Sequence, residues 1–490
     1  MLLLIGISVV LLIYFYFKKC FSFWKDRGFV YMEPSIPLGN FGTVGFKEHL
    51  SDFMRREYNN FKDKGPAFGM YLLTNPGIVI TDPELIKEVC STSFEHFHER
   101  GLYVNEKSDP LWKNLFTAGG QEWRDLRAKL SPTFTSGKIK MMFPIVAEAA
   151  DRMADYLKYE EITHECLEMK EIFASYTTEV IANIAFGLDT KCLGNHENEF
   201  RHITKNIFEP PKLKNFENFL IFSFPKFAKF FNLGINSKHV IEFFMATVRD
   251  NMEYREKNDI RRNDFFQLLI DVKNSDVGMS FDEITANSFI FFAAGFETSS
   301  NVMSFCSYEL ALNQDIQDRL RTEIEEVVER FNGEITYDGI KEMKYLDMVF
   351  NETLRIHPVV DTHVRKCTKD FKIPKTDLVI PAGVTVMIPA IGLHHDEKYF
   401  ENPDVFDPNR FSDENVKKLV SHTFIPFSEG HRMCIGQRFG TMQIKIGLVK
   451  LLRNFRIFPC NKTLVPMKYT PNSGFQSALG GMWLKLEHIN

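Results

Sequence analysis

Apolar residues along this 490-residue chain recur with a helical period over most of residues 120–330. Apolar positions repeated every three to four residues predict amphipathic helices. Strand-like runs are few and short. Residues 68–73 and 78–81 flank Asn75-Pro76-Gly77, which predicts a hairpin turning at those three residues, and a second strand region lies near residues 378–389. The pattern predicts a mainly α chain with a smaller β-sheet domain, in the α+β class.

The longest predicted helix covers residues 281–312. Ser280 and Glu283 stand three residues apart ahead of a long apolar run, which is the sequence signature of a capping box. At 1.5 Å per residue, a helix of this length would measure about 48 Å. We therefore expect one helix to cross most of a domain.

A glycine interrupts the middle of this helix. Gly295 costs about 1 kcal/mol relative to alanine, so a compensating role is expected. Ala294 and Gly295 precede Thr298 by four and three residues, and on a shared face they would leave a shallow notch beside the hydroxyl. The alternative is tight helix packing, with Thr298 bonded back to a backbone carbonyl.

The amino-terminal segment predicts a membrane anchor. Residues 1–17 carry no charge and are followed by Lys18 and Lys19. As a helix, seventeen residues span about 26 Å, near the lower limit for a bilayer core. In a cleaved signal peptide the positive residues would precede the apolar stretch, whereas here they follow it. Residues 1–19 are therefore assigned as an anchor, with the bulk of the chain on the cytoplasmic side.

The rest of the chain is expected to form one large unit. Residues 20–40 are basic and contain prolines, which predicts a stiff hinge. Residues 41–490 show no Ser/Gly-rich linker, repeat or low-complexity tract, so we assign them to a single catalytic domain. The net charge of -5 gives no indication of nucleic-acid binding.

The most informative stretch is residues 427–436, where Cys434 lies among glycines and follows an arginine. Glycines such as Gly436 allow a flat ligand to approach the backbone, and a Cys434 thiolate could then reach a metal. Arg432 could pair with a carboxylate of that ligand, and Phe427 would shield one side. The alternative is a buried, inert cysteine in a turn.

Neither a zinc site nor a disulfide framework fits the other cysteines. They are scattered, with no Cys-x-x-Cys pair and no Cys/His cluster. Eight free thiols favour a reducing, cytosol-facing compartment. The cysteines stand at positions 20, 90, 166, 192, 306, 367, 434 and 460.

The pattern Phe-x-x-Gly-x-Arg-x-Cys-x-Gly of residues 427–436 resembles the cysteine-ligand loop of the cytochrome P450 family. Residues 293–299 resemble the family's oxygen-binding helix motif, with Glu297 and Thr298 in the acid and alcohol positions. Residues 130–138 are similar to a stretch shared by microsomal members of insect family 6 and vertebrate family 3. The resemblance implies the P450 fold, with a long central helix over a haem.

The resemblance also implies the roles of individual residues. Cys434 would be the axial ligand of the iron of haem b, and Thr298 and Glu297 would be catalytic, managing protons while O2 is activated. The cofactor-binding set that follows from the resemblance and from the cysteine loop is Cys434, Arg432, Trp123, Arg127, Arg365, Arg100, Phe427, Gly436 and Ala294.

Glu352 and Arg355 are three residues apart and can pair on one helix face. Taken alone, they predict an ordinary surface salt bridge. In the family, the same Glu-x-x-Arg forms a buried network with an arginine of a downstream motif, here Arg410, and that role is structural rather than catalytic.

A phenylalanine-rich segment allows more than one interpretation. This segment, which contains Lys226 and Lys229, is either an aromatic core or an interfacial loop, and in the family this region roofs the substrate pocket. Its phenylalanines are Phe216, Phe219, Phe222, Phe224, Phe227, Phe230 and Phe231.

Lysines that could dock an acidic reductase are Lys129, Lys138, Lys140, Lys417 and Lys418. Candidate pocket residues include Phe291, Phe292, Ala294 and Asp361.

The implied function is a membrane-bound haem-thiolate monooxygenase of the endoplasmic reticulum, oxidising lipophilic compounds such as foreign toxins. NADPH would supply electrons through the FAD and FMN of NADPH-cytochrome P450 reductase, with cytochrome b5 a further candidate partner and membrane lipid a third. Alternatives are oxidation of an endogenous lipid or steroid hormone, a reductase-independent haem-thiolate isomerase, and a non-catalytic haem sensor.

Overall fold

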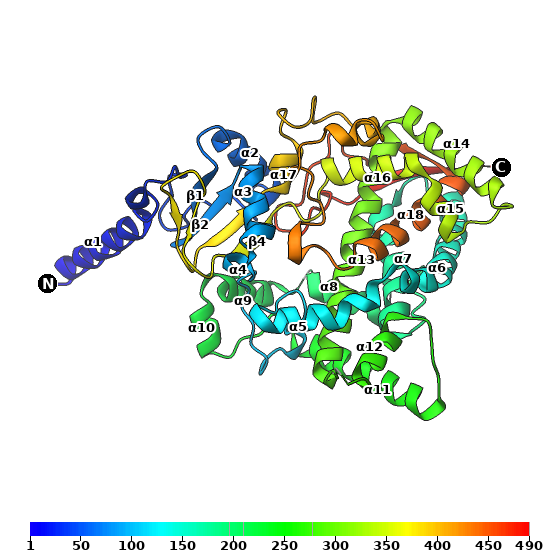
Figure 1. Cartoon of the computed structure of the whole chain (residues 1–490), viewed down its shortest axis with the longest axis horizontal. Coiled ribbons are helices and arrows are strands. Elements are labelled where there is room, and N and C mark those ends of the chain that lie inside the picture. Colours follow the sequence, from blue (N-terminus) through cyan, green and yellow to red (C-terminus); the bar gives the residue numbers. More distant parts are fainter. Residues whose placement is uncertain (196, 209, 277, 490) are drawn as a thin grey trace. The chain divides into compact units, whose positions relative to one another are not determined.

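The computed structural model describes residues 1–195, 197–208, 210–276 and 278–489. Its contacts divide the chain into two compact units, each of which is described by itself. Unit 1 comprises Met1–Leu102, Val360–Asp404 and Leu419–Met433; unit 2 comprises Tyr103–Val359, Val405–Lys418 and Cys434–Asn490. Most of the labelled elements in Figure 1 are helices, as the sequence pattern predicts.

Unit 1 is built on a four-stranded sheet. The strands lie in the order β1-β2-β7-β4, with β1 and β2 antiparallel and β2 parallel to β7. A two-stranded ribbon, β5-β6, accompanies it. The elements of unit 1 are α1 (Leu2–Phe21), η1 (Lys25–Arg27), α2 (Leu50–Phe61), β1 (Ala67–Leu72), β2 (Asn75–Ile80), α3 (Pro83–Lys87), η2 (Glu88–Thr92), α4 (Phe94–Phe97), β4 (His363–Lys366), β5 (Phe371–Lys372), β6 (Val379–Ile380), β7 (Thr385–Ile388), α17 (Ala390–His394) and η7 (Gly430–Arg432).

The predicted hairpin is present, but its turn lies two residues earlier than expected. Leu72 pairs with Asn75, so the connection is Leu73-Thr74, and Leu73 adopts a left-handed φ of 53°. Asn75-Pro76-Gly77 therefore begins β2 instead of forming the turn. Gly77 has a packing role, because a Cβ there would lie 2.8 Å from the Met387 methyl group on β7.

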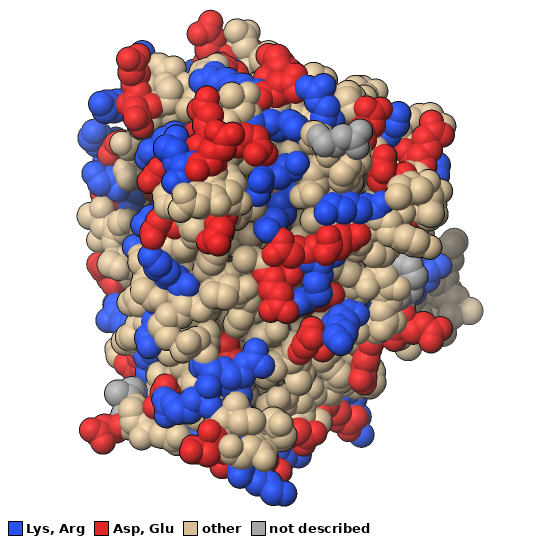
Figure 2. All heavy atoms as spheres, turned by 90° about the vertical axis from the view of Figure 1, so that its right-hand side faces the viewer, with Lys and Arg blue, Asp and Glu red and all other residues tan. Residues whose placement is uncertain are grey.

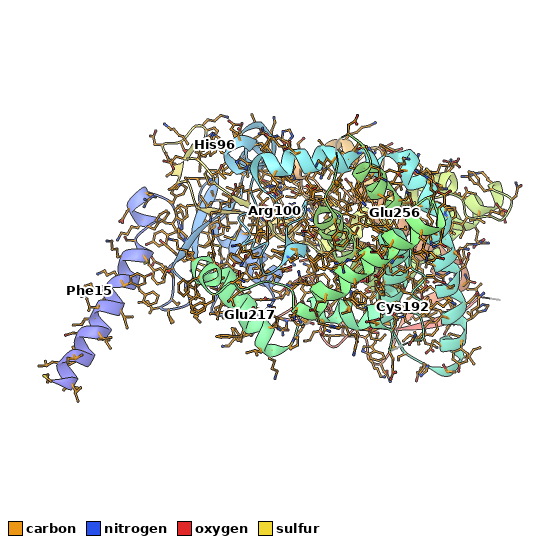
Figure 3. All side chains as sticks on the ribbon, turned by 90° about the horizontal axis from the view of Figure 1, so that it is seen from below. Phe15, His96, Arg100, Cys192, Glu217 and Glu256 are labelled. Atoms are coloured by element: carbon orange, nitrogen blue, oxygen red, sulfur yellow. The ribbon has the colours of Figure 1, made fainter. Side chains whose placement is uncertain are left out.

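Helix α1 is apolar and has no buried residue. With 20 residues, it is about 30 Å long, enough to cross a bilayer core. Figure 3 shows Phe15 on this helix, which projects from the rest of unit 1, and 59% of Phe15 is exposed. The helix is a candidate membrane anchor by length and composition.

The segment after α1 packs onto the sheet of unit 1. Trp24 is fully buried, and its indole N–H donates to the Met70 carbonyl at 3.1 Å. Gly69 accommodates it, because a Cβ at that position would collide with the indole ring. Part of the expected hinge, residues 20–40, is thus fixed by core contacts.

Unit 2 is mostly helical, with one small sheet in the order β3-β9-β8. Helix α13 packs against both α7 and α18 (Figure 1). The elements of unit 2 are η3 (Pro110–Trp112), α5 (Gly120–Leu130), η4 (Ser131–Phe134), α6 (Ser136–Thr163), β3 (Leu167–Glu168), α7 (Met169–Phe186), α8 (Glu199–Phe208), α9 (Lys212–Ser223), α10 (Pro225–Phe230), α11 (Lys238–Asn258), α12 (Phe265–Lys273), α13 (Phe281–Leu312), α14 (Gln314–Arg330), α15 (Tyr337–Glu342), α16 (Lys344–Ile356), η5 (Pro408–Phe411), η6 (Val416–Lys418), α18 (Gln437–Asn454), β8 (Phe455–Pro459) and β9 (Trp483–His488).

The predicted long helix is confirmed at both ends. α13 runs over Phe281–Leu312, and both halves of the capping box form. The Glu283 amide donates to the Ser280 hydroxyl at 3.1 Å, while the Ser280 amide donates to the Glu283 carboxylate at 2.8 Å. Two of the unpaired N–H groups at the helix start are satisfied in this way.

On one face of the chain (Figure 2), the charged surface is mixed in sign. On the face shown in Figure 2, basic and acidic side chains alternate, and neither sign forms a continuous field there. Such a face offers no extended positive track for a nucleic-acid backbone.

Candidate active site

In unit 2, Cys434 lies just before the amino terminus of α18, and its residue is exposed. Gly436 caps this helix, and a Cβ on Gly436 would meet nothing within 4 Å. The positive end of the helix dipole stabilises a thiolate at such a position. Cys434 is therefore not the buried, inert cysteine of the alternative interpretation.

Helix α5 (Gly120–Leu130) carries the predicted Trp-x-x-x-Arg pair. Trp123 is 5% exposed, and Arg127 is partly buried. Burial lowers the pKa of Arg127, while the nearby Cys434 acts in the opposite direction. A partly desolvated guanidinium thus lies within electrostatic reach of the thiol.

The part of the cysteine loop that belongs to unit 1 depends on Gly430. Its φ of 66° suits glycine, and a Cβ there would collide with the Cys90 carbonyl oxygen. Arg432 is 2% exposed and anchors the loop by donating through Nε and Nη2 to the His98 carbonyl, at 2.9 and 2.6 Å. Phe427 is half-buried nearby in the chain.

Three arginines gather in unit 1: Arg100, Arg365 and Arg432. Arg100 (Figure 3) follows His98, the acceptor of the Arg432 hydrogen bonds, by two residues. Burial, together with the positive charges of Arg365 and Arg100, lowers the pKa of His363 to about 4, so both arginines lie near this histidine. Such a group of guanidinium ions suits an anionic ligand.

Arg365 is 1% exposed, and burial lowers its pKa. Its Nη1 donates to the Val364 carbonyl and its Nη2 to the Ser428 hydroxyl, both at 2.9 Å. Its Nε is buried and has no hydrogen-bond partner of normal geometry among the residues that the structure describes, although the Cys90 thiol interacts with the guanidinium. A buried donor of this kind is expected to serve a ligand.

The middle of α13 presents Ala294 and Thr298 to an accessible surface, although most of the helix around them is packed. The Thr298 hydroxyl donates to the Ala294 carbonyl at 2.7 Å. Gly295 faces another way, because a Cβ there would lie 2.7 Å from the Ile181 side chain on α7. The expectation that Gly295 shares the notch is therefore wrong: this glycine permits close helix packing.

Glu297 is held by two donors within unit 2. The Lys170 ammonium donates to its Oε1 at 2.9 Å, and the Asn301 amide donates to the same oxygen at 3.1 Å. Lys170 also donates to the Ser300 hydroxyl at 2.7 Å. Sequence reasoning missed Lys170, because no local pattern connects it with Glu297 across 127 positions.

The comparisons with known proteins show the family of the chain. A family model described as "Cytochrome P450" matches residues 32–482. The chain belongs to the cytochrome P450 family. It is 40% identical to cytochrome P450 6a2 of Drosophila melanogaster, covering 99% of each chain, and 39% identical to cytochrome P450 6A1 of Musca domestica, covering 99% of this chain and 97% of that one. It is also 39% identical to probable cytochrome P450 6a14 of Drosophila melanogaster, over 96% of each chain.

P450 enzymes are monooxygenases that use haem and O2, and the residues present fit that cofactor. The buried donor on Arg365 suits a propionate carboxylate. The open space at Gly436 and the exposed thiol of Cys434 suit a flat macrocycle with a thiolate ligand. The assignment of individual ligand-binding residues stays a prediction.

Two of the pocket residues predicted for this P450 pack against other rings. Phe292 is fully buried among other rings, including Phe186 and Phe244. Phe291 stacks on Phe265 at 4.3 Å between ring centroids. Phe292 is therefore not accessible to a substrate in this structure, whereas Phe291 is half-buried and Ala294 is exposed.

Asp361, in unit 1 of this P450, has a structural partner. The Ser51 hydroxyl donates to its Oδ2 at 2.6 Å, and His49 lies 3.7 Å from the same oxygen. Burial raises the pKa of Asp361. These contacts account for the carboxyl without a substrate donor.

The phenylalanine-rich segment lies on α9 and α10, and the aromatic-core interpretation of it is wrong. Its rings are exposed by 45% to 83% of their residue areas, and Leu213 on the same helix pair is 81% exposed. A contiguous apolar stretch of this kind marks an interaction surface. The exposed set is Phe216, Phe219, Phe222, Phe224, Phe227, Phe230 and Phe231.

Proposed function

We propose that this P450 is anchored in the endoplasmic reticulum membrane and inserts one oxygen atom of O2 into lipophilic foreign compounds. The observation that carries the proposal is the accessible Ala294 and Thr298 pair in the otherwise packed α13. Haem, when bound, supplies the oxygen-activating chemistry, in which one oxygen atom enters the substrate and the other leaves as water. Oxidation of an endogenous lipid or steroid hormone is the second candidate.

Cys434 would act as the thiolate ligand of the iron, kept anionic by the amino terminus of α18. The propionates would be held by guanidinium and indole donors. Those donors are Arg432, Arg365, Arg100, Trp123 and Arg127, and the wall against the ring would include Phe427, Gly436 and Ala294.

Thr298 and Glu297 would handle protons. The Thr298 Oγ1 proton now points to the Ala294 carbonyl, so the hydroxyl can pass it on only by rotating away from that acceptor. Glu297 would relay protons from the solvent side, with Lys170 and Asn301 fixing the position of its Oε1. A fixed acceptor lowers the reorganisation that each proton transfer requires.

This proton-handling pair also discriminates between the proposed function and its rivals. A haem-thiolate isomerase needs no reductase and no proton delivery during oxygen activation, so Thr298 and Glu297 would have no task there. A haem sensor has no use for a catalytic hydroxyl on an accessible helix patch.

Electrons would come from NADPH through the FAD and FMN of NADPH-cytochrome P450 reductase, with cytochrome b5 as a further candidate. Of the five lysines expected to dock these partners, we keep Lys138, Lys417 and Lys418 and leave out Lys129 and Lys140. Lys417 and Lys418 are exposed, whereas Lys140 and Lys129 are committed to Asp338 and Glu283, at 2.6 and 3.8 Å. Such patches act mainly on association rate.

The function is tested by reconstituting the haem-loaded chain with purified reductase in lipid vesicles. NADPH consumption and product formation are measured over a panel of lipophilic toxins, insecticides and steroids. We expect reductase-dependent products that carry one added oxygen atom from labelled O2. Turnover without reductase would favour the isomerase, and no turnover across the panel would contradict the proposal.

In the same assay, Thr298→Ala is expected to bind haem normally but to lose coupling, because the hydroxyl that passes protons is gone. Product per NADPH should fall by about tenfold or more, with hydrogen peroxide making up the difference. Thr285→Ala on the same helix, whose hydroxyl only bonds back to Phe281, is the matched control and should stay coupled. Tight coupling in Thr298→Ala would remove the proton role.

We further propose that the exposed phenylalanines of α9 and α10 enter the headgroup region, with Lys226 and Lys229 at its surface. Phe219→Asp combined with Phe227→Asp should raise KM for a membrane-dissolved substrate by about tenfold or more and leave kcat nearly unchanged. Tyr254→Asp replaces an aromatic residue of similar exposure on α11 and serves as the control. An unchanged KM in vesicles would contradict this surface assignment.

A further inference from the structure

Two cysteines of unit 2, Cys166 and Cys460, lie next to the two edge strands of its small sheet. Cys166 directly precedes β3, and Cys460 directly follows β8. These strands flank β9, and the neighbouring residues Leu167 and Pro459 both pair with Leu484. The two strands reach the level of Leu484 on either side of β9, and the contact of Cys166 with Asn461, the residue after Cys460, brings together two thiols that are nearly 300 positions apart in sequence.

A tight turn holds Cys460 in place. Its amide donates to the Thr463 hydroxyl at 2.8 Å, and the single proton of that hydroxyl can be donated either to the Trp483 carbonyl at 2.6 Å or to the Cys460 sulfur at 3.8 Å. The Cys166 thiol donates to the Asn461 side-chain oxygen in the same turn, at 3.4 Å. Both cysteines are partly exposed, so a small reagent in solvent can reach them.

The two thiols also interact with each other, and they differ in acidity. Burial opposes ionisation of Cys460, but hydrogen bonds from Cys166, from the backbone of Lys462 and from Thr463 bring its pKa below the ordinary value. Burial and the Cys460 contact raise the pKa of Cys166. The Thr463 hydroxyl beside the Cys460 sulfur favours a thiolate there, so we assign Cys460 as the attacking sulfur.

The other cysteines offer no comparable pair. Cys90, Cys192, Cys306 and Cys367 are buried, and burial raises the pKa of each to about 11 or 12. Buried thiols of this kind are inert toward oxidants in solution. Cys20 belongs to the apolar helix α1.

We propose that Cys166 and Cys460 form an oxidisable dithiol site, which hydrogen peroxide converts into a disulfide. The Cys460 thiolate attacks one peroxide oxygen, the O–O bond breaks, and the leaving hydroxide takes up a proton to become water, which leaves a sulfenic acid on Cys460. The Cys166 sulfur then displaces hydroxide from the Cys460 sulfur, and that hydroxide leaves as a second water with the Cys166 proton. Two thiols and one peroxide give one disulfide and two waters.

The disulfide would fasten the base of a segment that reaches α13. Residues 461–482 follow Cys460, and Phe475 within them packs against Phe208 at 5.8 Å between ring centroids. Phe208 in turn packs against Phe296, the neighbour of Glu297 in α13, at 5.3 Å. Oxidation of the two cysteines would thus restrain residues 461–482, which contact α13 through Phe208. The dithiol site does not depend on the proposed function, because the peroxide can be added directly.

The test uses the full-length, haem-loaded chain, reduced and then treated with stepwise equivalents of hydrogen peroxide. Trypsin separates the two cysteines into residues 159–170 and 457–462, each with a single cysteine. After alkylation of free thiols, we expect these two peptides to appear joined by a bond that dithiothreitol cleaves. Cys192 is the internal control and should stay a free thiol.

Variants separate the two steps of the proposal. Cys166→Ser should stop the reaction at a sulfenic acid on Cys460, which dimedone traps. Thr463→Val should slow disulfide formation by about tenfold, since it removes the hydroxyl beside the Cys460 sulfur, and Thr463→Ser should restore the rate. Haem content is measured for each variant to verify folding. Free thiols on both peptides after peroxide treatment, or a bond from either cysteine to a different partner, would overturn the proposal.

Discussion

Cys434→Ser is expected to abolish monooxygenase turnover and the carbon-monoxide difference band that thiolate-ligated haem gives on reduction. The position before α18 favours an anionic sulfur, and a serine hydroxyl in the same place stays protonated and binds iron weakly. The variant should still fold, because the Cys434 residue is exposed and contributes little to the core. The measurement is the reduced carbon-monoxide spectrum together with NADPH-supported product formation.

Cys460→Ser is the matched control for this substitution, since it removes another partly accessible sulfur from unit 2. It should keep both the band and the turnover. Survival of the thiolate band in Cys434→Ser would remove Cys434 as the ligand. Loss of the band in both variants would indicate misfolding instead, and circular dichroism distinguishes that outcome.

Features set by neighbouring residues could be predicted from the sequence. The start of the long helix follows from the Ser280 and Glu283 capping box, a local arrangement within four consecutive residues. The hairpin was predicted too, but its turn was misplaced. The sequence favours Gly77 as a turn glycine, whereas in the structure it lies against the Met387 side chain on β7, which a Cβ would force to shift, and only the folded sheet creates that contact.

Features set by distant packing could not be predicted in the same way. Gly295 fits two explanations in sequence, and the close approach of Ile181 from α7 decides between them. The partner of Glu297, Lys170, comes from the start of α7, and no spacing rule identifies it. Composition alone also does not decide whether a ring such as Phe230 is buried. In the structure, Phe230 is 83% exposed.

Glu352→Gln is expected to destabilise the protein severely. Glu352 and Arg355 are both fully buried, and Arg355 donates to both carboxylate oxygens, at 2.7 and 2.8 Å. Arg410 donates to the same carboxylate at 3.3 Å, and the Asp407 amide does so at 2.9 Å. This is the buried network implied by the family resemblance, and the surface-salt-bridge interpretation is wrong.

Removing the charge of Glu352 leaves the buried Arg355 without its counterion. Breaking a buried pair in this way costs about 3–5 kcal/mol, against about 0–1 kcal/mol for an exposed pair. Asp338→Asn breaks the Lys140 pair, in which both side chains are more than half exposed, and is the control. The urea midpoint of unfolding and the haem retained after purification are the measurements. Equal midpoints for the two variants would contradict a structural role for the network.

The Glu352–Arg355 pair is expected to fix the position of η5 against α16 more than to add net stability. Burial raises the pKa of Glu352, although its arginine partners oppose that shift. The cost of removing water from both charges offsets much of their attraction, so replacing both members by methionine should destabilise less than the sum of the single changes. A double variant as unstable as that sum would show that the two side chains act independently.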